Sequence, residues 1–578
     1  MSTLTAENKT IYSLLSSKGT SFLIPDYQRP YSWGIQECEA LWDDLYSYAI
    51  PEGNIDNYSD DHGYFLGTII VYKNNNRLEI IDGQQRLTSL YLLLRALYDK
   101  FFGMLDEKST STREMIGKCL WQTDMYDRAQ IGQIRLDSEV ATDESRDEFK
   151  SIVNTGKTVE DCVSNYTRNF LFFKQQVDRT ASEQPSYLAP LAARILLSVN
   201  LLPIEADSQD TALRIFSTLN DRGMPLSDSD IFKSQLYRYY SSLGRKDEFI
   251  SRWKDLERDA NLVFSPRKGT PLDELFAKYM YFIRAKNGIT GNQTCGLRDF
   301  YSQNNYKLLH EDNCLDDLES LIGFWKQIYS QEDFSDRVLN RLFVLKYSTN
   351  NVWTYILSVW FMVNRDDDNK VSENDLYQFL NILTAFLLTC SLAKEPIGSV
   401  RSMMLREILN IVQHRPLTFS NYKLKTSQFK TNCKPGNFSN ARPITKFVLA
   451  WWAFEDPYQR VLPIDTALEI EHIYSVRRNK IRPLRSRGLL DSLGNKSLIE
   501  KRINIRASDY NFSDKRLCYQ GMTEGSNTIV KEPTQIRDLY TLAVNNADFT
   551  ENQIVQRNNK IHQALQSYLE KYGFISKR

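Results

Sequence analysis

The alternation of apolar and polar positions predicts a strand–turn–helix unit between residues 65 and 97. Residues 65–72 (FLGTIIVY) and 78–81 (LEII) are strand-like runs separated by the polar turn KNNNR, as in a hairpin. An Asp-Gly turn follows, and then a leucine-rich helix whose first turn holds two amides, a guanidinium and a hydroxyl. Orphan N–H groups and the helix dipole attract anions at such a place, so the motif suits a phosphate. A corner with polar caps would have the same composition.

Hydrophobic spacing elsewhere predicts a mostly helical chain with few strands. Helices are expected at residues 1–20, 36–48, 212–220, through most of 235–430 and in the tail 533–575, and a further strand at 199–204. Residues 22–33 (FLIPDYQRPYSW) carry two prolines, which favour extended backbone, and interleaved aromatic side chains. The turn at 220–226 ends one helix, and Ser227 or Asp228 is expected to cap the next.

The C-terminal third differs, because a strand at residues 467–474 delivers Glu471 and His472 side by side near its end. Six Arg or Lys residues follow between 477 and 487 with no acidic residue among them, and Asn495 and Asn504 come next. Neighbouring strand side chains point to opposite faces, so the pair can act together only where the strand ends or bends. Such a set can supply a base, a metal ligand and phosphate contacts for phosphodiester cleavage. A lone histidine and a solvated cationic loop are also common structural features.

Length and composition narrow the picture only a little. A chain of 578 residues suggests about three domains. The 72 basic and 72 acidic residues balance, so net charge argues neither for nor against nucleic acid. The 8 cysteines form no C-x-x-C pair, which disfavours a zinc knuckle or redox motif. The N-terminus has no signal pattern, and the uncharged stretch 376–393 is expected to be a buried helix rather than a membrane span. We therefore expect a cytoplasmic protein without a membrane partner.

Four segments resemble the GmrS-type domain, which has a ParB/sulfiredoxin-like nucleotide-binding fold: residues 24–33, 65–69, 82–88 and 216–227. The resemblance implies that this domain binds and hydrolyses an NTP, either GTP, UTP or ATP. The residues predicted to bind or hydrolyse the nucleotide are Asp82, Gly83, Gln84, Gln85, Arg86 and Thr88, with Asn220 and Arg222 closing over the same site.

The segments around Glu471-His472-Ile473, Leu493-Gly494-Asn495, Asn504 and 512–515 resemble the GmrD-type domain, an HNH (His-Me finger, ββα-metal) nuclease. The resemblance implies that His472 is the general base and that Asn495 orients it. It also implies that Glu471 and Asn504 lie on the side of an Mg²⁺ or Mn²⁺ ion. One departure is that Ser475 stands where the family has proline, so the bend after the strand can differ.

The expected fold is a multidomain α+β protein that is predominantly helical. Its parts are a GmrS-type α/β domain at 1–240 (core 20–100 plus 199–233), a helical linker or scaffold at 241–435, and a GmrD-type HNH domain with a helical tail at 436–578. DNA contacts are predicted for Tyr27, Gln28, Arg29, Tyr31, Trp33 and His62 in the first domain and for Arg477, Arg478, Arg482 and Lys515 in the last. The rings of the aromatic segment suit a soft, weakly hydrated group, or they simply pack the motif.

Proteins with both domains are similar to modification-dependent type IV restriction enzymes of phage defence, including relatives that sense phosphorothioate DNA. The resemblance implies an NTP-dependent endonuclease or nickase acting on modified double-stranded DNA. Two other functions stay open. One is a nucleotide-regulated DNA-binding or scaffold protein with an inactive HNH domain, and the other is a non-specific nuclease held off by nucleotide. The modification that is read, and whether the protein forms a homodimer, are not determined by the sequence.

Overall fold

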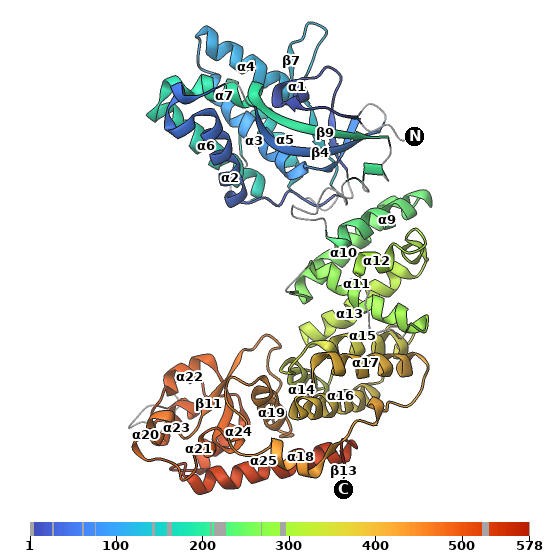
Figure 1. The fold of residues 1–578 in the computed structure, drawn as a ribbon, viewed down its shortest axis with the longest axis vertical. Helices are drawn as coiled ribbons and strands as arrows, with labels where there is room; N and C mark the ends of the chain where they lie inside the picture. The colour runs from blue at the N-terminus through green and yellow to red at the C-terminus, as the bar shows by residue number, and fades with distance from the viewer. Residues whose placement is uncertain are drawn as a thin grey trace. The chain divides into compact units, whose positions relative to one another are not determined.

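The computed structural model forms two compact units, residues 1–254 and 255–578, and each is described by itself (Figure 1). The described residues are 5–25, 28–59, 63–74, 77–140, 145–158, 164–207, 211–212, 215, 227–266, 269–289, 296–522 and 531–576. The expectation of a mostly helical α+β chain is confirmed. The predicted three-domain division and the ParB-like and HNH identities of its parts stay predictions.

A mixed seven-stranded sheet organises the first unit, in the order β1-β9-β4-β5-β3-β8 with β2 beside β9. Its strands are β1 (Thr5–Ala6), β2 (Lys9–Thr10), β3 (Phe22–Ile24), β4 (Tyr64–Asn74), β5 (Arg77–Asp82), β8 (Leu136–Ser138) and β9 (Val199–Ala206). The predicted hairpin is confirmed as β4 and β5, which pair antiparallel, and the strand at 199–204 is confirmed as β9, parallel to β4. The pattern missed β8, because three residues are too short to show an alternation. The helix expected at 1–20 is wrong for the same reason: the described part of this segment holds the two-residue strands β1 and β2 and a helix only at Ile11–Leu15.

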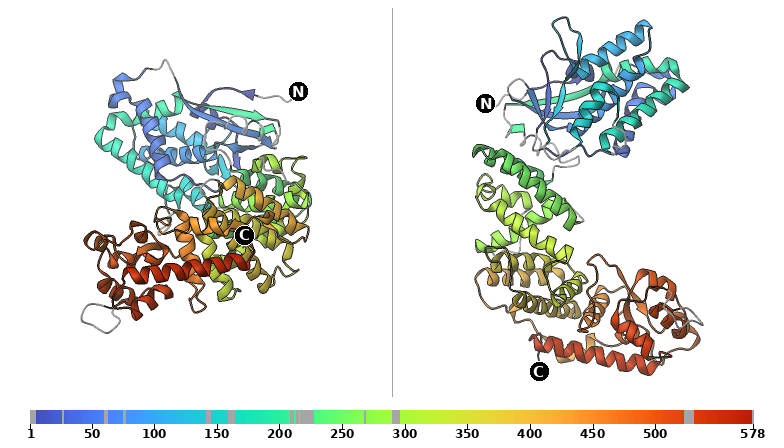
Figure 2. Two further views of the ribbon diagram at one scale, coloured as in Figure 1. Left: turned by 60° about the horizontal axis from the view of Figure 1, so that its bottom comes forward. Right: turned by 180° about the vertical axis from the view of Figure 1, so that it is seen from behind.

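Helices cover one face of this sheet (Figures 1 and 2), among them α2 (Ile35–Ala49), α3 (Gln84–Phe101), α6 (Asn165–Glu183) and α7 (Leu188–Ser198). The same core contains α1 (Ile11–Leu15), α4 (Glu107–Leu120) and α5 (Arg146–Thr155), and a small hairpin joins β6 (Trp121–Thr123) to β7 (Ala129–Ile134). Alternation along the strands divides the isoleucines: Ile69 and Ile80 join the large core under the helices, whereas Ile70 and Ile81 join a small cluster. Helix α3 is buried on every side from Leu87 to Leu97, which explains the run of apolar residues in its middle.

Two helices end the first unit and lead into the second. Helix α9 (Asp228–Ser242) begins at Ser227, whose Oγ accepts the backbone N–H of Asp230 at 3.1 Å, so the predicted cap is confirmed. Helix α10 (Lys246–Val263) follows. Most of the helix predicted at 212–220 and the turn after it lie outside the described residues.

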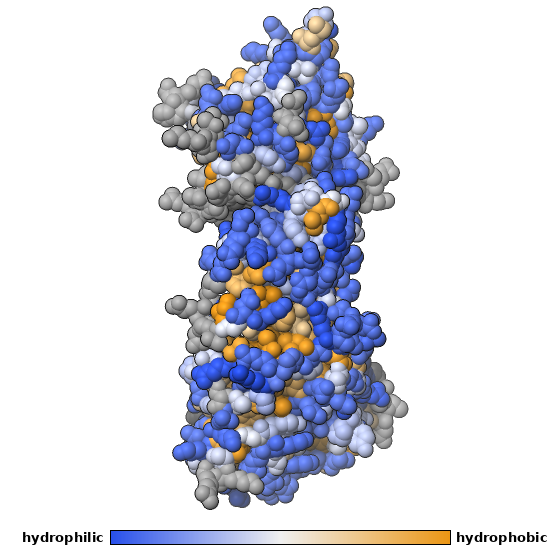
Figure 3. Space-filling model, turned by 90° about the vertical axis from the view of Figure 1, so that its right-hand side faces the viewer, coloured by the Kyte–Doolittle hydropathy of each residue, from blue (hydrophilic) through white to orange (hydrophobic). Residues whose placement is uncertain are grey.

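The second unit starts with a stack of helices: α11 (Pro271–Lys286), α12 (Leu297–Tyr301), α13 (Cys314–Ser330), α14 (Asp336–Lys346), α15 (Val352–Asn364), α16 (Glu373–Ala393), α17 (Ile397–Val412), α18 (Thr426–Asn432) and α19 (Pro443–Phe454). Helix α16 is long and apolar enough to cross a membrane, but 72% of its apolar window is buried, which confirms the prediction of a buried helix. A groove of about 290 Å³ between α11, α15 and α17 is lined by apolar side chains such as Ile397. Figure 3 shows apolar surface over this helical part of the unit.

The C-terminal part holds the strand that carries His472. Strand β11 (Leu468–His472) pairs antiparallel with β12 (Lys496–Glu500), and α22 (Lys501–Ala507) follows β12 at once. Around this hairpin lie α20 (Val476–Ile481), α21 (Arg487–Leu490), the 3₁₀ turn η7 (Leu493–Asn495), α23 (Phe512–Gln520), α24 (Arg537–Asn545) and the long α25 (Glu551–Lys571). Strands β10 (Leu424–Lys425) and β13 (Ile575–Ser576) pair parallel near the C-terminus.

Candidate functional site

The N-terminal candidate site is the turn between β5 and α3. Strand β5 ends at Asp82, and Gly83 adopts φ 91°, a left-handed conformation that favours glycine and aims the first turn of α3. Burial raises the pKa of the Asp82 carboxyl, whereas the Gly83 N–H and the guanidinium groups of Arg86 and Arg29 act in the opposite direction. The predicted motif is therefore assembled in space, and Arg29 joins it from the aromatic segment.

Gln85 binds the aromatic segment rather than facing an open site. Its Oε1 accepts the backbone N–H groups of Ser32 at 2.7 Å and Trp33 at 3.1 Å, and its Nε2 donates to the Pro30 carbonyl at 3.1 Å. Only 6% of Gln85 is exposed. This placement commits both the oxygen and the nitrogen of the buried amide to residues 30–33, which does not fit the nucleotide role that the resemblance implies.

Two further residues, Gln28 and Tyr31, also attach the aromatic segment to β5 and α3. The Gln28 amide donates to the Ile81 carbonyl at 3.3 Å, and the Tyr31 hydroxyl is hydrogen-bonded to Ser89 Oγ at 2.7 Å. Asn169 Nδ2 donates to the same hydroxyl at 2.8 Å. Of the two uses left open for this segment, the structure favours packing for Gln28 and Tyr31, which are buried, while Trp33 is half-buried against the core. The predicted residues Tyr27, His62, Asn220 and Arg222 lie outside the described residues.

The groups that remain at this turn fit an anion. Arg86 donates to the Thr68 carbonyl at 3.0 Å and lies against Gly67, where an added Cβ would come within 2.9 Å of Arg86 Nη1. Within the part of the chain that the structure describes, Gln84 Oε1 is buried without a hydrogen-bond partner. The first N–H groups of α3 add partial positive charge. Thr88, only 2% exposed, is too deep to contact a ligand in this arrangement.

We expect Gln85→Ala to lower the free energy of unfolding by about 1–3 kcal/mol, the usual cost of leaving buried donors unpaired. The variant removes the acceptor of two backbone N–H groups and the donor to Pro30. Urea unfolding of Gln85→Ala beside Gln36→Ala, an exposed glutamine of α2, measures the difference. Equal unfolding midpoints in the two variants would show that Gln85 does not anchor the segment.

In the C-terminal candidate site, Glu471 and His472 point to opposite faces of β11, as the alternation requires. Glu471 Oε1 accepts Lys515 Nζ at 2.7 Å and the Tyr519 hydroxyl, and the whole carboxylate is buried. Burial raises the pKa of the Glu471 carboxyl, and the Lys515 ammonium opposes this shift. Lys515 Nζ also donates to the His472 carbonyl at 2.7 Å, so one ammonium fixes both residues.

His472 is the last residue of β11, and its imidazole is neutral with its Nε2 atom buried. Its side chain is 19% exposed, and its Nε2 stands 3.7 Å from Asp491 Oδ1, which Lys496 Nζ already holds at 2.7 Å. Burial, with the nearby Lys496 ammonium, lowers the pKa of His472 to about 4. The ring is therefore unprotonated at neutral pH, the form in which an imidazole can accept a proton.

Asn495 holds the bend that follows His472. Its Oδ1 accepts the backbone N–H of Tyr474 at 2.7 Å, and its Nδ2 donates to the Tyr474 carbonyl at 3.1 Å. The Ile473 N–H donates to the Asn495 carbonyl at 2.9 Å. Ser475, at the position where the family has proline, caps α20 by accepting the Arg478 N–H at 3.1 Å. The bend is thus fixed by hydrogen bonds in place of the proline ring.

The residues that the resemblance places beside a metal do not fit one as they lie. The Glu471 carboxylate is taken by an ammonium and a hydroxyl, and the Asn504 amide donates to Glu469 Oε2 at 2.6 Å. A buried lysine beside the carboxylate opposes a second positive charge. In the described parts of the chain, no three His, Cys, Asp or Glu side chains gather as a metal would require. The predicted pair therefore does not form a divalent-cation site in this arrangement.

The basic segment after His472 is divided between structural and exposed cations. Arg478 is paired with Asp548 at 2.6 Å and stacks 4.5 Å from the Tyr474 ring centre, so it anchors α20. Arg477 and Arg482 are exposed. Lys515 differs from the sequence-based expectation of a DNA contact, because only 1% of it is exposed and its charge is spent on Glu471.

The sequence did not point to several residues that surround Glu471 and His472. Tyr519 stands four residues after Lys515 on α23, a spacing that places both on one helix face, and this was the one available signal. Asp491 and Lys496 flank the Leu-Gly-Asn turn and contact each other, and Arg557 reaches that turn from α25. Nothing in the local pattern marks these three, since their partners lie in other elements.

Two comparisons bear on what these sites belong to. Residues 11–237 match the GmrSD restriction endonuclease N-terminal domain, and residues 421–564 match the GmrSD restriction endonuclease C-terminal domain. None of the curated proteins compared with the chain matches it. The two matched ranges contain the Asp82 turn and the His472 strand respectively, so both candidate sites fall inside them. The chain belongs to the GmrSD restriction endonucleases.

Proposed function

We propose that this restriction endonuclease cuts DNA at His472 and is controlled by a nucleotide bound at the Asp82 turn. The observation that carries the proposal is the placement of His472: it ends a strand, on a bend that Asn495 fixes, shortly before the exposed Arg477 and Arg482. A restriction endonuclease acts on DNA, and here a histidine adjoins a segment whose Arg477 and Arg482 are exposed. The neutral imidazole supports the assignment.

In the proposed reaction, the His472 imidazole takes a proton from the attacking water as its oxygen bonds to the phosphorus, the P–O bond to the leaving deoxyribose oxygen breaks, and that oxygen takes up a proton from solvent. Lys515 and Asn495 keep the strand end in place while the proton moves, one through the His472 carbonyl and the other through the Tyr474 backbone. Arg477 and Arg482 hold the DNA phosphates on either side of the reacting one. A rigid bend matters, because the base must stay within hydrogen-bonding reach of the water.

The nucleotide half of the proposal rests on the anion-compatible groups at the Asp82 turn. Arg86, Arg29 and the first turn of α3 are suited to NTP phosphates, and Asp82 is suited to orienting the hydrolytic water. We propose that hydrolysis of GTP, UTP or ATP licenses cutting of modified DNA, as the family resemblance implies. Gln85 and Gln28 do not contact the nucleotide in this proposal. They hold in place the segment that carries Arg29.

One observation favours a second function. Glu471 is locked to Lys515 and Tyr519, and its expected partner Asn504 is bonded to Glu469, so the arrangement supports a DNA-binding or scaffold protein whose HNH-like part is inactive. The requirement for Mg²⁺ or Mn²⁺ stays a prediction of the resemblance, and no step above depends on it.

The deciding experiment measures NTP hydrolysis and plasmid nicking side by side on unmodified, methylated, glucosylated and phosphorothioated DNA. We expect one modified plasmid to be nicked with Mg²⁺ or Mn²⁺ and NTP present, while unmodified plasmid stays intact. One candidate active site per chain favours nicks unless the protein dimerises. A protein that shifts every plasmid on a gel and nicks none is the inactive scaffold, and cutting of unmodified plasmid without NTP indicates a nuclease held off by nucleotide.

We expect the double substitution Arg477→Ala with Arg482→Ala to weaken DNA binding without changing its sequence dependence. Each lost phosphate contact lowers the slope of log Kd against log salt by about 0.9, so the two together lower it by about 2. Filter binding between low and moderate salt measures the slope. Arg415→Ala, an exposed arginine after α17, is the matched control. An unchanged slope in the double variant would remove α20 from the DNA-binding surface.

A further inference from the structure

Helix α25 is hydrogen-bonded to the Leu493–Lys496 turn, which leads into β12. Arg557 Nη1 donates to three backbone carbonyls of this turn, those of Leu493 at 3.0 Å, Gly494 at 3.1 Å and Lys496 at 2.7 Å. The two N–H groups of Nη1 are shared among these three carbonyl acceptors. One charged nitrogen therefore holds three backbone groups of the turn together. Arg557 lies 61 to 64 residues after these partners in the sequence, so no local motif marks it.

There is no room between the turn and the helix. Asn558 Oδ1 accepts the Gly494 N–H at 3.2 Å, so the residue after Arg557 binds the same turn. A Cβ added to Gly494 would lie 2.1 Å from the Ile554 carbonyl oxygen, a contact that no side chain tolerates. Glycine is therefore required here by close approach of two backbones, and the turn takes its position from α25.

From the turn, hydrogen bonds lead directly to the catalytic strand. Asn495 is the last residue of η7, and it fixes both backbone groups of Tyr474 and the N–H of Ile473. Lys496, whose carbonyl Arg557 binds, lies opposite His472 in the β11–β12 register. A displacement of the turn thus moves the bend after His472 and the strand beside it at once.

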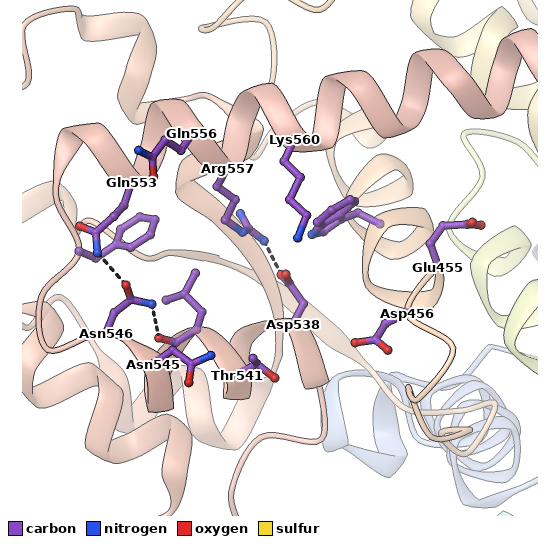
Figure 4. Close-up of a pocket in the computed structure, with 13 residues that line it drawn as sticks. Glu455, Asp456, Asp538, Thr541, Asn545, Asn546, Gln553, Gln556, Arg557 and Lys560 are labelled. Atoms are coloured by element: carbon purple, nitrogen blue, oxygen red, sulfur yellow. Dashed lines mark hydrogen bonds and ion pairs between the residues drawn. The ribbon is translucent and has the colours of Figure 1, made fainter.

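Asp538 on α24 sets the orientation of Arg557. Its carboxylate is paired with Arg557 Nη2, and both line a cavity of about 530 Å³ between α19, α24 and α25. Figure 4 shows the Asp538 and Arg557 side chains pointing toward each other and joined as an ion pair, with Lys560 on the same side of α25. Arg557 is 9% exposed at the cavity wall, so its four contacts are made in a largely dry place where they hold firmly.

We infer that Arg557 is a positioning residue for DNA cleavage: its guanidinium fixes the Leu493–Lys496 turn and, through Asn495, the bend that carries His472. The inference rests on the proposed role of His472. Arg557 touches neither the DNA nor the imidazole; it acts by keeping the base at the right place. A misplacement of the order of 1 Å is enough to cost about 100-fold in rate.

The test compares Arg557→Ala and Arg557→Lys with Lys560→Ala, a cation of the same helix that lines the same cavity. Nicking is measured under single-turnover conditions at increasing plasmid concentration, on the plasmid that the wild type cuts. For Arg557→Ala we expect the rate at saturating DNA to fall about 100-fold, while the half-saturating DNA concentration stays within about twofold. Arg557→Lys should recover part of this loss, because its ammonium still reaches one or two of the carbonyls. Lys560→Ala should cut as the wild type does.

A residue that only stabilises the fold would give a different result. A saturated rate for Arg557→Ala within about threefold of the wild type overturns the inference, and so does a loss confined to DNA affinity. If Arg557→Ala does not fold, by thermal unfolding, Arg557→Lys decides: a wild-type saturated rate in that folded variant overturns the inference. His472→Ala separates this from the proposed function. Cutting by His472→Ala refutes the base, whereas an inactive His472→Ala beside fully active Arg557 variants refutes only the positioning role.

Discussion

Replacing His472 with alanine is expected to abolish plasmid nicking while NTP hydrolysis stays at the wild-type rate. The variant removes the proposed general base, which typically contributes about 10²–10⁴-fold to the rate. His472 lies in the second unit and the Asp82 turn in the first, so the nucleotide site keeps all of its groups. Nicking and NTP hydrolysis, measured on the same preparation with the plasmid that the wild type cuts, give the two rates.

His414→Ala is the matched control for this prediction, because His414 is exposed just after α17 and outside both candidate sites. Loss of both activities in His472→Ala would contradict the division of labour between the two units. Full nicking by His472→Ala would remove the residue from the mechanism and leave the hairpin without a base.

The pKa of His472 also sets how the nicking rate and the free energy of unfolding should depend on pH. The neutral form persists down to about pH 4 in the folded protein, so the nicking rate should hold through neutral pH and fall only as the pH approaches 4. An unfolded histidine takes up its proton near pH 6.5, which means that the unfolded state binds more protons between about 6.5 and 4. His472 therefore lowers the free energy of unfolding progressively as the pH falls through this window. The buried His562, whose pKa is lowered to about 4 by burial, acts in the same direction.

Replacing Arg86 with alanine is expected to lower NTP hydrolysis by about 10²-fold or more, and nicking of modified plasmid with it. Arg86 lies in the first turn of α3, and removing one preorganised donor from developing phosphate charge typically costs this much. Its contact with the Thr68 carbonyl is a charge-assisted hydrogen bond and its guanidinium lies near the buried Asp82 carboxyl, so the free energy of unfolding should fall by about 1.5–3 kcal/mol. A phosphate-release assay and nucleotide binding by calorimetry measure the two steps separately.

Arg168→Ala, an exposed arginine on α6, controls for the loss of one charge from the same unit. Wild-type hydrolysis by Arg86→Ala would move the nucleotide away from this turn. If hydrolysis is lost and nicking continues unchanged, the turn is a nucleotide site that does not control the nuclease.

Much of the fold that positions the two sites is legible in the local pattern. Strand-like runs on either side of a polar turn predict the β4–β5 hairpin, and Asp82-Gly83 before a leucine-rich segment predicts the start of α3. Ser227 is correctly expected to cap α9, and His472 to stand at the end of its strand. These features depend on backbone preference and on periodicity over a few residues, so neighbouring residues suffice to specify them.

The sequence by itself determined where the turns, strands and titratable side chains stand; the tertiary structure decided what each of them contacts. Gln85 looks like a ligand-binding amide until residues 30–33, more than 50 positions away, are seen to bond both its oxygen and its nitrogen. Lys515 looks like a DNA contact until burial pairs it with Glu471. Arg557 carries no signal at all until α25 lies against the Leu-Gly-Asn turn. A polar group's role depends on whether its bonds are already satisfied, and long-range packing settles that.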